Sequence, residues 1–405
     1  MSKNFNHKNL ITSADKQCNV CGKERLKIVI NLPDLPLTDT YCKEPPEEKI
    51  ECFDQKLLHC TNCLHCQLAN QINPSILYGD IYQFRTSVSQ TARHGTELFI
   101  KYIDDICHPS SFSTVLDLGC NDLYLLNNIR HKAKKCIGID PIWANREKEV
   151  NEKDFTVYGF NIEEIDLGNI LEESPDLILC RHTLEHIGNP KAVLEKLISV
   201  SADNALFVFE VPGFDTLLKK MRFDQVFHQH LQYFSLKSMM QLIKELNATF
   251  LGYRENYHDW GSFTIAFSKD RSAESRENKV KIPDWDSSQI KKNYELFKLQ
   301  METANTILDR FKGERLYGYG AAQMLPILSY HMKNDFSGLI SILDDDPAKD
   351  GLGYGNLPVK IEHPKHINDL EDATLLITAI DNVNPIMKKL LNIRPRHIIH
   401  PFHII

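Results

Sequence analysis

Two pairs of cysteines near the start of the chain have the spacing of metal ligands, Cys18 with Cys21 and Cys60 with Cys63. In each pair the two intervening residues form a turn that can point both sulfurs at one ion, so the two pairs can close a tetrahedron around Zn²⁺. Because four thiolates leave no open coordination position, we expect the zinc to stabilise the fold and not to act on a substrate. The alternatives are unpaired buried thiols, or replacement of one ligand by a neighbouring side chain: Cys42, Cys52, Cys66, His59 or His65.

A glycine loop between two apolar runs is the second feature that could do chemistry. It reads Asp117-Leu118-Gly119-Cys120-Asn121-Asp122, and Asp140-Pro141 ends the next apolar run. The glycine would let backbone approach a nucleoside, while Asp140 would accept hydrogen bonds from ribose hydroxyls. A dinucleotide loop normally has Gly-x-Gly-x-x-Gly, whereas Gly119 stands alone here, so a cofactor without a diphosphate is predicted. S-adenosylmethionine, a nucleoside with an amino-acid tail and no phosphate, fits this pattern.

The residues expected to bind this cofactor lie in the glycine loop and at the ends of the following strands. They are Asp117, Gly119, Cys120, Asn121, Asp122, Asp140, Pro141, Asn161 and Arg181. The alternative is a structural or inactive relative of the same fold.

Histidines supply the candidates for proton transfer. His228 and His230 lie among aromatic residues in the segment 223–235, and histidine is the side chain best suited to move a proton near neutral pH. A His-x-His pair could instead bind a metal or make hydrogen bonds in the core. Glu185 and His186, in the segment 182–190, could take part in catalysis or only orient the following helix.

The elements that must position these residues begin at Ser113, where short apolar runs alternate with helical stretches. This alternation is typical of βαβ units on a mostly parallel sheet. The runs 114–119, 136–141, 176–182 and 205–212 are expected to be successive strands. The loops at the carboxyl ends of such strands face the ligand.

A second α/β pattern opens at Arg315 and includes the glycine turn at Gly320, followed by apolar runs at 340–347, 374–379 and 397–401. A helix that starts after Gly320 could receive a phosphate of a nucleotide-linked substrate, or the domain could serve architecture alone. A charged connecting helix is expected over 287–312. Its predicted buried stripe is Ile290, Tyr294, Phe297, Met301, Ile307 and Leu308.

The chain is predicted to be α/β, because apolar runs alternate with helical stretches in both patterns. Its 405 residues exceed the length that one core usually serves, so two or three domains are expected. A central class I methyltransferase sheet would be flanked by a small zinc module and a second Rossmann-like domain. The expected division is a zinc module at 1–80, a methyltransferase domain at 81–268, a helical linker at 269–312 and a Rossmann-like domain at 313–405.

Composition narrows the functional classes. Apolar residues make up 42% and charged residues 25%, as in ordinary soluble proteins. The net charge of -7 argues against a general nucleic-acid binder, and the sequence shows neither a membrane span nor a signal peptide. A cytoplasmic location is expected, with a small molecule as the partner; the oligomeric state is left open.

The order of these parts resembles the sugar C-methyltransferase family, which methylates deoxysugars attached to a nucleoside diphosphate. Besides the cysteine pairs and the glycine loop, the motifs that carry the resemblance are the 223–235 segment, Trp260-Gly261-Ser262 and Gly318-Tyr319-Gly320-Ala321-Ala322. The resemblance implies that a 4-keto sugar loses the proton on the neighbouring carbon and that the enolate takes the methyl group. The family's base is the second histidine of a Tyr-His-Glu-His motif, which aligns with His230.

This chain departs from the family at three residues that would contact substrate and at one, Leu123, in the loop near the methionine tail of the cofactor. Phe227 and Phe84 align with two family tyrosines, Gln229 aligns with the motif glutamate, and Leu123 aligns with a glycine. Loss of one preorganised oxyanion donor can cost on the order of 100-fold in rate. The departures therefore favour a different acceptor or other donors. The residues expected to bind substrate are Tyr82, Phe84, Phe227, Gln229, Tyr233 and Gly320, with Arg85 and His228 as further donors.

Three functions are consistent with the sequence. The first is C-methylation of a nucleotide-activated sugar with His230 as base. The second is O- or N-methylation of a sugar or other small metabolite, which needs no oxyanion donor. The third is a zinc-stabilised binding or scaffold protein with a relict cofactor pocket.

Overall fold

The computed structural model describes residues 10–11, 16–47, 50–73, 77, 85–106, 111–256, 261–273 and 280–402. Tyr82 and Phe84, two of the residues expected to contact substrate, lie outside these ranges, as does Trp260.

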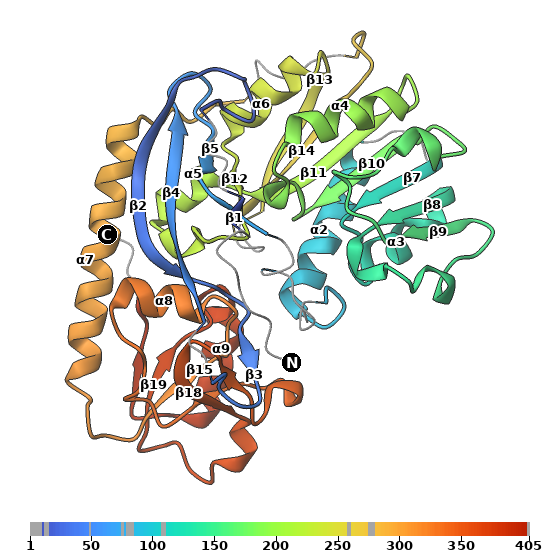
Figure 1. Ribbon diagram of the computed structural model, residues 1–405. Helices are drawn as coiled ribbons and strands as arrows, with labels where there is room; N and C mark the ends of the chain where they lie inside the picture. Colours follow the sequence, from blue (N-terminus) through green and yellow to red (C-terminus); the bar gives the residue numbers. More distant parts are fainter. Residues whose placement is uncertain are drawn as a thin grey trace.

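The centre of the molecule is a seven-stranded sheet in the order β13-β14-β11-β10-β7-β8-β9 (Figure 1). Its strands are β7 (Phe112–Leu118), β8 (Ala133–Ile139), β9 (Phe155–Tyr158), β10 (Leu177–Arg181), β11 (Leu206–Pro212), β13 (Thr249–Asn256) and β14 (Ser262–Ser268). The strands from β9 to β11 pair in parallel, and β14 is antiparallel to both of its neighbours. The chain adds β8 and β9 on one side of β7 and then β10 on the other. Open sheets bind ligands beyond the strand ends at such a switch in order.

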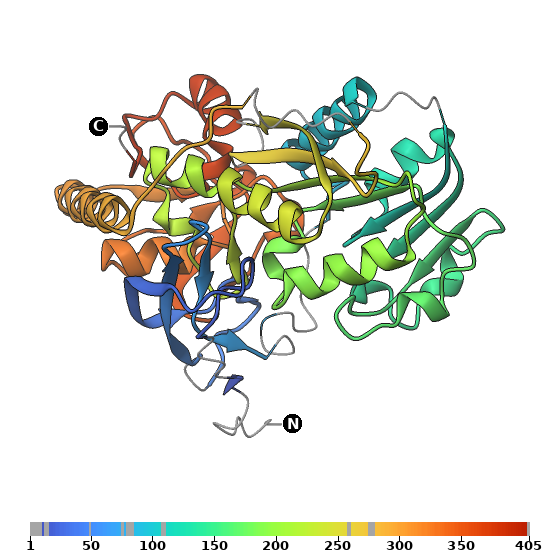
Figure 2. The same cartoon turned by 90° about the horizontal axis from the view of Figure 1, so that it is seen from above.

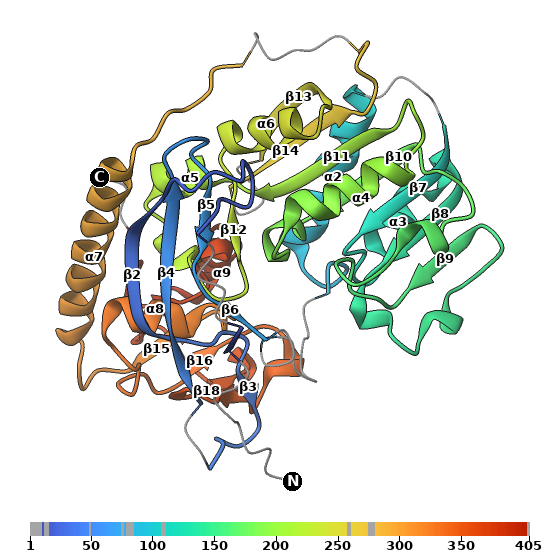
Figure 3. The ribbon, with the colours of Figure 1, turned by 45° about the horizontal axis from the view of Figure 1, so that its top comes forward.

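Helices cover both faces of this sheet (Figure 3). The helices of this part are α2 (Gln90–Ile106), α3 (Tyr124–Ile129), α4 (Pro190–Val200), α5 (Phe214–Lys220) and α6 (Leu236–Glu245). Side chains alternate along each strand. Val115 and Leu177 therefore pack with α2 and α3, whereas Leu116 and Ile178 pack with α4 and α6. Both faces are buried, which explains the continuous apolar runs of the sequence.

The amino-terminal module forms a sheet in the order β12-β5-β4-β2. Its strands are β2 (Leu26–Pro36), β4 (Cys52–Cys60), β5 (Cys66–Leu68) and β12 (Gln232–Tyr233), while β1 (Leu10–Ile11) pairs with β6 (Gln71–Ile72). Strand β12 comes from the methyltransferase part of the sequence and pairs with β5. The segment that contains His228 and His230 is therefore joined to the zinc module by backbone hydrogen bonds.

The carboxyl-terminal sheet has the order β20-β19-β15-β16-β18-β17-β3. Its strands are β15 (Leu316–Tyr319), β16 (Ile342–Leu343), β17 (Gly353–Tyr354), β18 (Leu357–Glu362), β19 (Thr374–Ile377), β20 (His397–Ile399) and β3 (Tyr41–Cys42), and its helices are α8 (Leu325–Met332) and α9 (Val383–Ile393). The strands from β20 to β18 are parallel, and β3 from the amino-terminal module extends the edge. The predicted α/β class with two Rossmann-like sheets and a small amino-terminal module is confirmed.

The predicted connecting helix is α7 (Ser287–Asp309), which begins at a capping box formed by Asp286 and Gln289. It lies against β2 and α8, on the side of the molecule opposite β9 (Figures 1 and 2). The predicted stripe is buried except for Ile307, which is half-buried, and Ala304 joins it. Within the described ranges, no helix has the length and apolar character that crossing a bilayer requires.

The division into four segments remains a proposal. Two strand pairings cross its borders, β12 with β5 and β3 with β17.

Candidate active site and metal centre

The four predicted zinc ligands come together at the ends of β4 and of the loop before β2. The sulfurs of Cys18 and Cys63 lie 3.5 Å apart, those of Cys21 and Cys60 lie 3.6 Å apart, and all four lie within 4.8 Å of one another. Sulfurs on a tetrahedral zinc with bonds of about 2.3 Å lie about 3.8 Å apart, so the residues fit the ion. The crowded thiols share hydrogen bonds that lower the pKa of Cys60 and raise the pKa values of Cys18 and Cys63, so it is the geometry that supports the metal site.

Both cysteine turns have the same backbone geometry. The amide of Gly22 donates to the Cys18 carbonyl at 2.8 Å, and the amide of Leu64 donates to the Cys60 carbonyl at 2.9 Å. Gly22 and Leu64 both adopt the left-handed conformation, with φ of 65° and 61°. Leu64 tolerates this conformation less easily than glycine does, which indicates that the turn is held by its surroundings. Of the alternative ligands, His65 instead bonds Gln232 at 2.9 Å.

The glycine loop joins the ends of β7, β8 and β10. Gly119 has a φ of 73°, and a Cβ at this position would lie 1.9 Å from Oγ1 of Thr183, in the loop after β10. Asp140, at the end of β8, accepts hydrogen bonds from the amides of Asn121 (2.8 Å) and Ile142 (3.0 Å). The absence of a side chain at Gly119 therefore allows the two loops to pack, in addition to any approach to a ligand. Each carboxylate oxygen of Asp140 accepts one backbone hydrogen bond, which orders the loop.

Asp117 provides the test of whether the loop fits S-adenosylmethionine. Its side chain is buried, and within the described part of the chain its Oδ1 has no hydrogen-bond partner. Burial and the neighbouring Asp140 raise the pKa of Asp117. A buried acceptor at the carboxyl end of the first parallel strand suits the ammonium of an amino-acid tail, so the residues present fit this cofactor.

Arg181 lies at the end of β10 and is held by a buried carboxylate. Its Nε donates to Oε2 of Glu210 at 2.6 Å, and Glu210 also accepts from Ser262 (2.6 Å) and Asn256 (2.9 Å). Burial opposes ionisation, but Arg181 and these donors lower the pKa of Glu210 below its usual value. Glu210 was not a sequence candidate, and its position at the end of the fifth parallel strand is the signal that could have identified it.

The remaining cofactor candidates lie in the glycine loop and after β8 and β9. Asp122 accepts from the amide of Ser87 at 2.9 Å, Asn161 forms a turn with Glu163 after β9, Cys120 is buried, and Pro141 is exposed.

His230 lies beside two residues of the loop that follows β10. Its ring centroid is 4.9 Å from that of His186, and donor atoms of His230, His186 and Glu185 all lie within 4.8 Å of one another. Burial and the nearby His186 lower the pKa of His230 to about 3, so its imidazole is neutral at pH 7. Glu185 is fully buried; burial alone would raise its pKa, but His182, His186 and His230 lower it to about 2.

His228 occupies a different environment, in the core against the zinc module. Its Nε2 donates to the Leu35 carbonyl at 3.0 Å, which leaves Nδ1 to accept from Gln55 at 3.4 Å. Burial lowers its pKa to about 4. Both ring nitrogens are therefore occupied by structural hydrogen bonds, a placement that favours His230 over His228 for proton transfer.

The candidate substrate residues of the 223–235 segment differ in what their side chains contact. The Phe227 ring lies 4.2 Å from the His230 ring, measured between centroids. Gln229 accepts from the Thr38 hydroxyl (3.2 Å) and donates to the Leu77 carbonyl (3.2 Å). The Tyr233 hydroxyl is buried and accepts from the Phe227 amide at 3.1 Å, so it fixes the loop.

Gly320, at the end of β15, has a φ of 95° and lies close to Ala379. The amide of the next residue, Ala321, donates to Asp344 at 2.7 Å. This repeats, in the second domain, the arrangement of Asn121 and Asp140.

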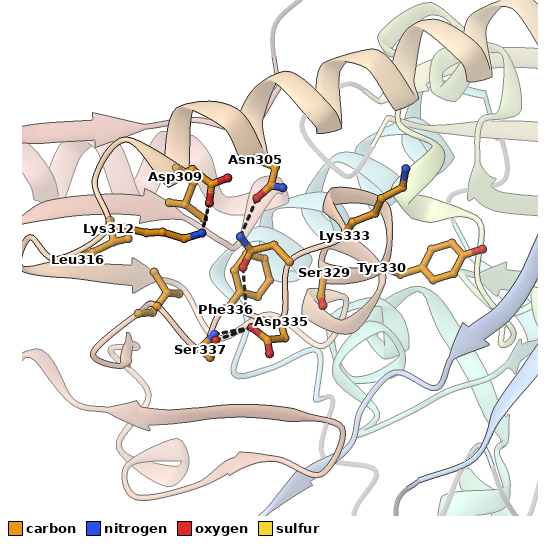
Figure 4. Close-up of a pocket in the computed structure, with 14 residues that line it drawn as sticks. Asn305, Asp309, Lys312, Leu316, Ser329, Tyr330, Lys333, Asp335, Phe336 and Ser337 are labelled. Carbon is orange, nitrogen blue, oxygen red and sulfur yellow. Dashed lines mark hydrogen bonds and ion pairs between the residues drawn. The ribbon is translucent and has the colours of Figure 1, made fainter.

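A cavity of about 600 Å³ lies elsewhere, between the end of α7 and the loop 333–339 (Figure 4). Its polar groups bond one another: Asn334 with Asn305 (2.7 Å) and Lys312 with Asp309 (2.7 Å). It contains none of the predicted site residues.

Comparison with known proteins identifies two parts of the chain. Residues 91–251 match the family described as "Methyltransferase domain", and residues 18–78 match the family described as "Putative zinc binding domain". The chain carries a methyltransferase domain. The predicted enzyme class is thereby confirmed, and the predicted pair of cofactors, S-adenosylmethionine and structural Zn²⁺, agrees with these two domains.

A curated relative of this chain is the C-methyltransferase NovU of Streptomyces niveus. It is 25% identical over 238 residues, which are 56% of this chain and 54% of the relative. The chain thus spans about half the length of the relative that it matches. Together with the two domain matches, this relative confirms the resemblance seen in the sequence.

Solved structures that resemble this chain include the N-methyltransferase NodS of Bradyrhizobium japonicum WM9 in complex with S-adenosyl-L-homocysteine. It is 13% identical, the match covers 44% of this chain and 88% of that one, and the TM-score is 0.34. A second is an S-adenosylmethionine-dependent methyltransferase of Clostridium acetobutylicum, with 11% identity, 43% and 89% coverage and a TM-score of 0.33.

Proposed function

We propose that this protein transfers a methyl group from S-adenosylmethionine to a carbon of a nucleotide-activated sugar, next to a keto group, with His230 as the proton acceptor. The observation that carries the proposal is the position of His230. Its ring lies beside Glu185 and His186, which belong to the loop after β10, and β10 pairs with β7, the strand that ends in the glycine loop.

The two loops are in contact. Cys180 of β10 pairs with Leu118 of β7, so the residues after them leave the sheet side by side. Thr183 then packs against Gly119. An acceptor bound between these loops could present its reacting carbon to the sulfonium methyl, and such transfer depends mainly on positioning because the bound cofactor supplies an already activated methyl group.

Proton removal needs a neutral base close to an acidic C–H, and a keto group acidifies the neighbouring carbon. A ring nitrogen of the neutral His230 has a lone pair for this proton. Burial and His186 lower the pKa of His230 and so weaken it as a base, whereas the neighbouring Glu185 carboxylate acts to raise that pKa. The ionised Glu185 would then stabilise the imidazolium that forms, as a buried carboxylate does in catalytic His–acid pairs.

The carboxyl-terminal domain supports a nucleotide-linked substrate. The glycine loop at Gly320 has the same backbone-to-carboxylate geometry as the cofactor loop. The amino-terminal module connects the 223–235 segment to the residues after Gly320, because Thr38 donates to Gln229 and Asp39 accepts from Gln323, each at 3.2 Å. A long substrate could therefore contact the domain around Gly320 with one end while its sugar reaches His230.

Phe227 favours a second candidate, methylation of oxygen or nitrogen. Its ring lies against His230, where the resembling family has a hydroxyl donor, and it carries none. Transfer to oxygen or nitrogen forms no enolate, so it needs no donor to stabilise one. A screen of nucleotide sugars with labelled cofactor, read by mass spectrometry, tests both candidates. If no keto sugar is methylated and a sugar is methylated on a hydroxyl or amino group, the result favours the second candidate.

Calorimetry of S-adenosylmethionine with zinc-loaded protein tests the third possibility, a scaffold with a relict pocket. Binding is expected; its absence from well-folded protein would support the scaffold.

A further inference from the structure

Three potential metal ligands converge at the loop after β10, remote in sequence from the cysteine site. Glu185 and His186 are neighbours in the chain, and His230 comes from the loop before β12. One donor atom from each lies within 4.8 Å of the other two. In the described part of the chain, only the four cysteines form another such group.

The hydrogen bond of His186 sets its tautomer. Nδ1 lies 2.8 Å from the backbone carbonyl of Gln229, and a carbonyl can only accept, so Nδ1 carries the hydrogen. The lone pair is therefore on Nε2. A histidine that ligates a metal commonly donates its other ring N–H to a carbonyl in this way, which fixes the ring and makes the ligating nitrogen more basic.

Glu185 brings a carboxylate that the protein leaves incompletely bonded. The residue is 1% exposed, and its Oε2 has no hydrogen-bond partner in the part of the chain that the structure describes. Its other oxygen lies 3.5 Å from Nδ1 of His182. A buried carboxylate oxygen without a partner is costly, and a metal ion at the histidines would satisfy it.

We propose that Glu185, His186 and His230 form a second metal site, which binds a divalent first-row transition ion. Two imidazoles and one carboxylate suit Zn²⁺, Fe²⁺ or Mn²⁺ better than Mg²⁺ or Ca²⁺, which prefer oxygen ligands throughout. Three protein ligands leave at least one open position, unlike the closed cysteine site. Ligands of a tetrahedral ion with bonds of about 2.1 Å lie about 3.4 Å apart. The donor atoms, which lie within 4.8 Å of one another, therefore need to approach by at most about 1.4 Å.

Metal binding and proton acceptance would both use the imidazole of His230. An ion that occupies the lone pair of His230 prevents this ring from taking a proton. If His230 is the base, excess metal inhibits methyl transfer, whereas the binding itself does not depend on what the enzyme methylates.

Cobalt titration of the full-length, zinc-loaded protein tests the site. The wild type is expected to bind one Co²⁺ beyond its structural zinc, with weak visible bands and without the near-ultraviolet charge-transfer absorption that thiolate ligands produce. Glu185→Gln and His186→Ala are expected to weaken this binding at least tenfold. His131→Ala, which removes an exposed histidine, is the matched control and should bind as the wild type does.

Two results would overturn the proposal: no additional Co²⁺ on the wild type, or binding that is unchanged in both ligand variants. If either variant fails to fold, the wild-type spectrum still decides. Thiolate charge transfer at the second equivalent would place the ion on cysteine and refute the site.

Discussion

Replacement of Gly119 by alanine tests whether the cofactor loop depends on its contact with the loop after β10. The new Cβ would meet three atoms of Thr183, at 1.9, 2.8 and 2.8 Å, and the backbone φ of 73° disfavours any side chain. The left-handed conformation costs roughly 1–2 kcal/mol for a non-glycine residue. Overpacking in a tight site costs about 1–3 kcal/mol more. Gly119→Ala should therefore destabilise the protein by about 2–5 kcal/mol, unless the loop moves.

The double variant with Thr183→Ala separates the two causes. Alanine at position 183 removes Oγ1 and Cγ2, two of the three clashing atoms, and leaves the backbone strain. Thr183→Ala alone should cost about 1 kcal/mol, because its hydroxyl donates to the Arg181 carbonyl at 3.3 Å. The double variant should therefore recover about 1–3 kcal/mol relative to the sum of the single changes.

Urea unfolding without cofactor measures these differences, and calorimetry measures cofactor binding. A loop that relieves strain by moving must recover its geometry to bind, and each 1.4 kcal/mol weakens affinity about tenfold. If Gly119→Ala is as stable as the wild type and binds cofactor equally well, the close approach of the loops is refuted. If Thr183→Ala gives no rescue, the backbone alone explains the loss.

Three further predictions concern other parts of the molecule. Burial lowers the pKa of His331 to about 3 from an ordinary value near 6.5, so the folded protein loses stability as the pH falls below about 6.5. In urea unfolding, His331→Leu should remove about 2 kcal/mol of the stability loss between pH 7 and pH 5. An unchanged pH dependence would contradict this prediction. The guanidinium nitrogens of Arg222 lie 2.8 Å from a carboxylate oxygen of Asp224 and 2.9 Å from one of Asp381. Arg222→Met removes this partner and should lower the free energy of unfolding in urea by roughly 3–5 kcal/mol. A decrease below about 1 kcal/mol would show that the ion pairs contribute little to stability. Cys60→Ser should remove the structural zinc and lower the unfolding temperature, as measured by metal analysis and calorimetry; retention of zinc at full stability would exclude Cys60 as a ligand.

Local sequence patterns predicted the parts of the site that local chemistry determines. The Cys-x-x-Cys spacing predicted four ligands that the structure brings within 4.8 Å. Apolar runs predicted the parallel strands, because those strands are buried on both faces. Gly119 was predicted to lie in a loop between two apolar runs, and it does so with a positive φ.

Contacts between distant segments were not predictable in this way. Strands β3 and β12 are two residues long, too short to show a period, and each pairs with another part of the chain. His228 and His230 are two residues apart, and only the family resemblance distinguishes them in the sequence; in the structure one bonds Leu35 and the other lies beside His186. Nothing near Gly119 in the sequence indicates Thr183 as its neighbour.

The most direct test of the proposed function is the site of methylation. The protein is incubated with S-adenosylmethionine that carries a ¹³C methyl group and with a nucleotide-linked keto sugar that is deuterated at the carbon next to the carbonyl. Two-dimensional NMR should show the labelled methyl group bonded to that carbon, with the deuterium lost to solvent, and His230→Ala should abolish both changes. A labelled methyl group on oxygen or nitrogen, with the deuterium retained, would contradict the proposal.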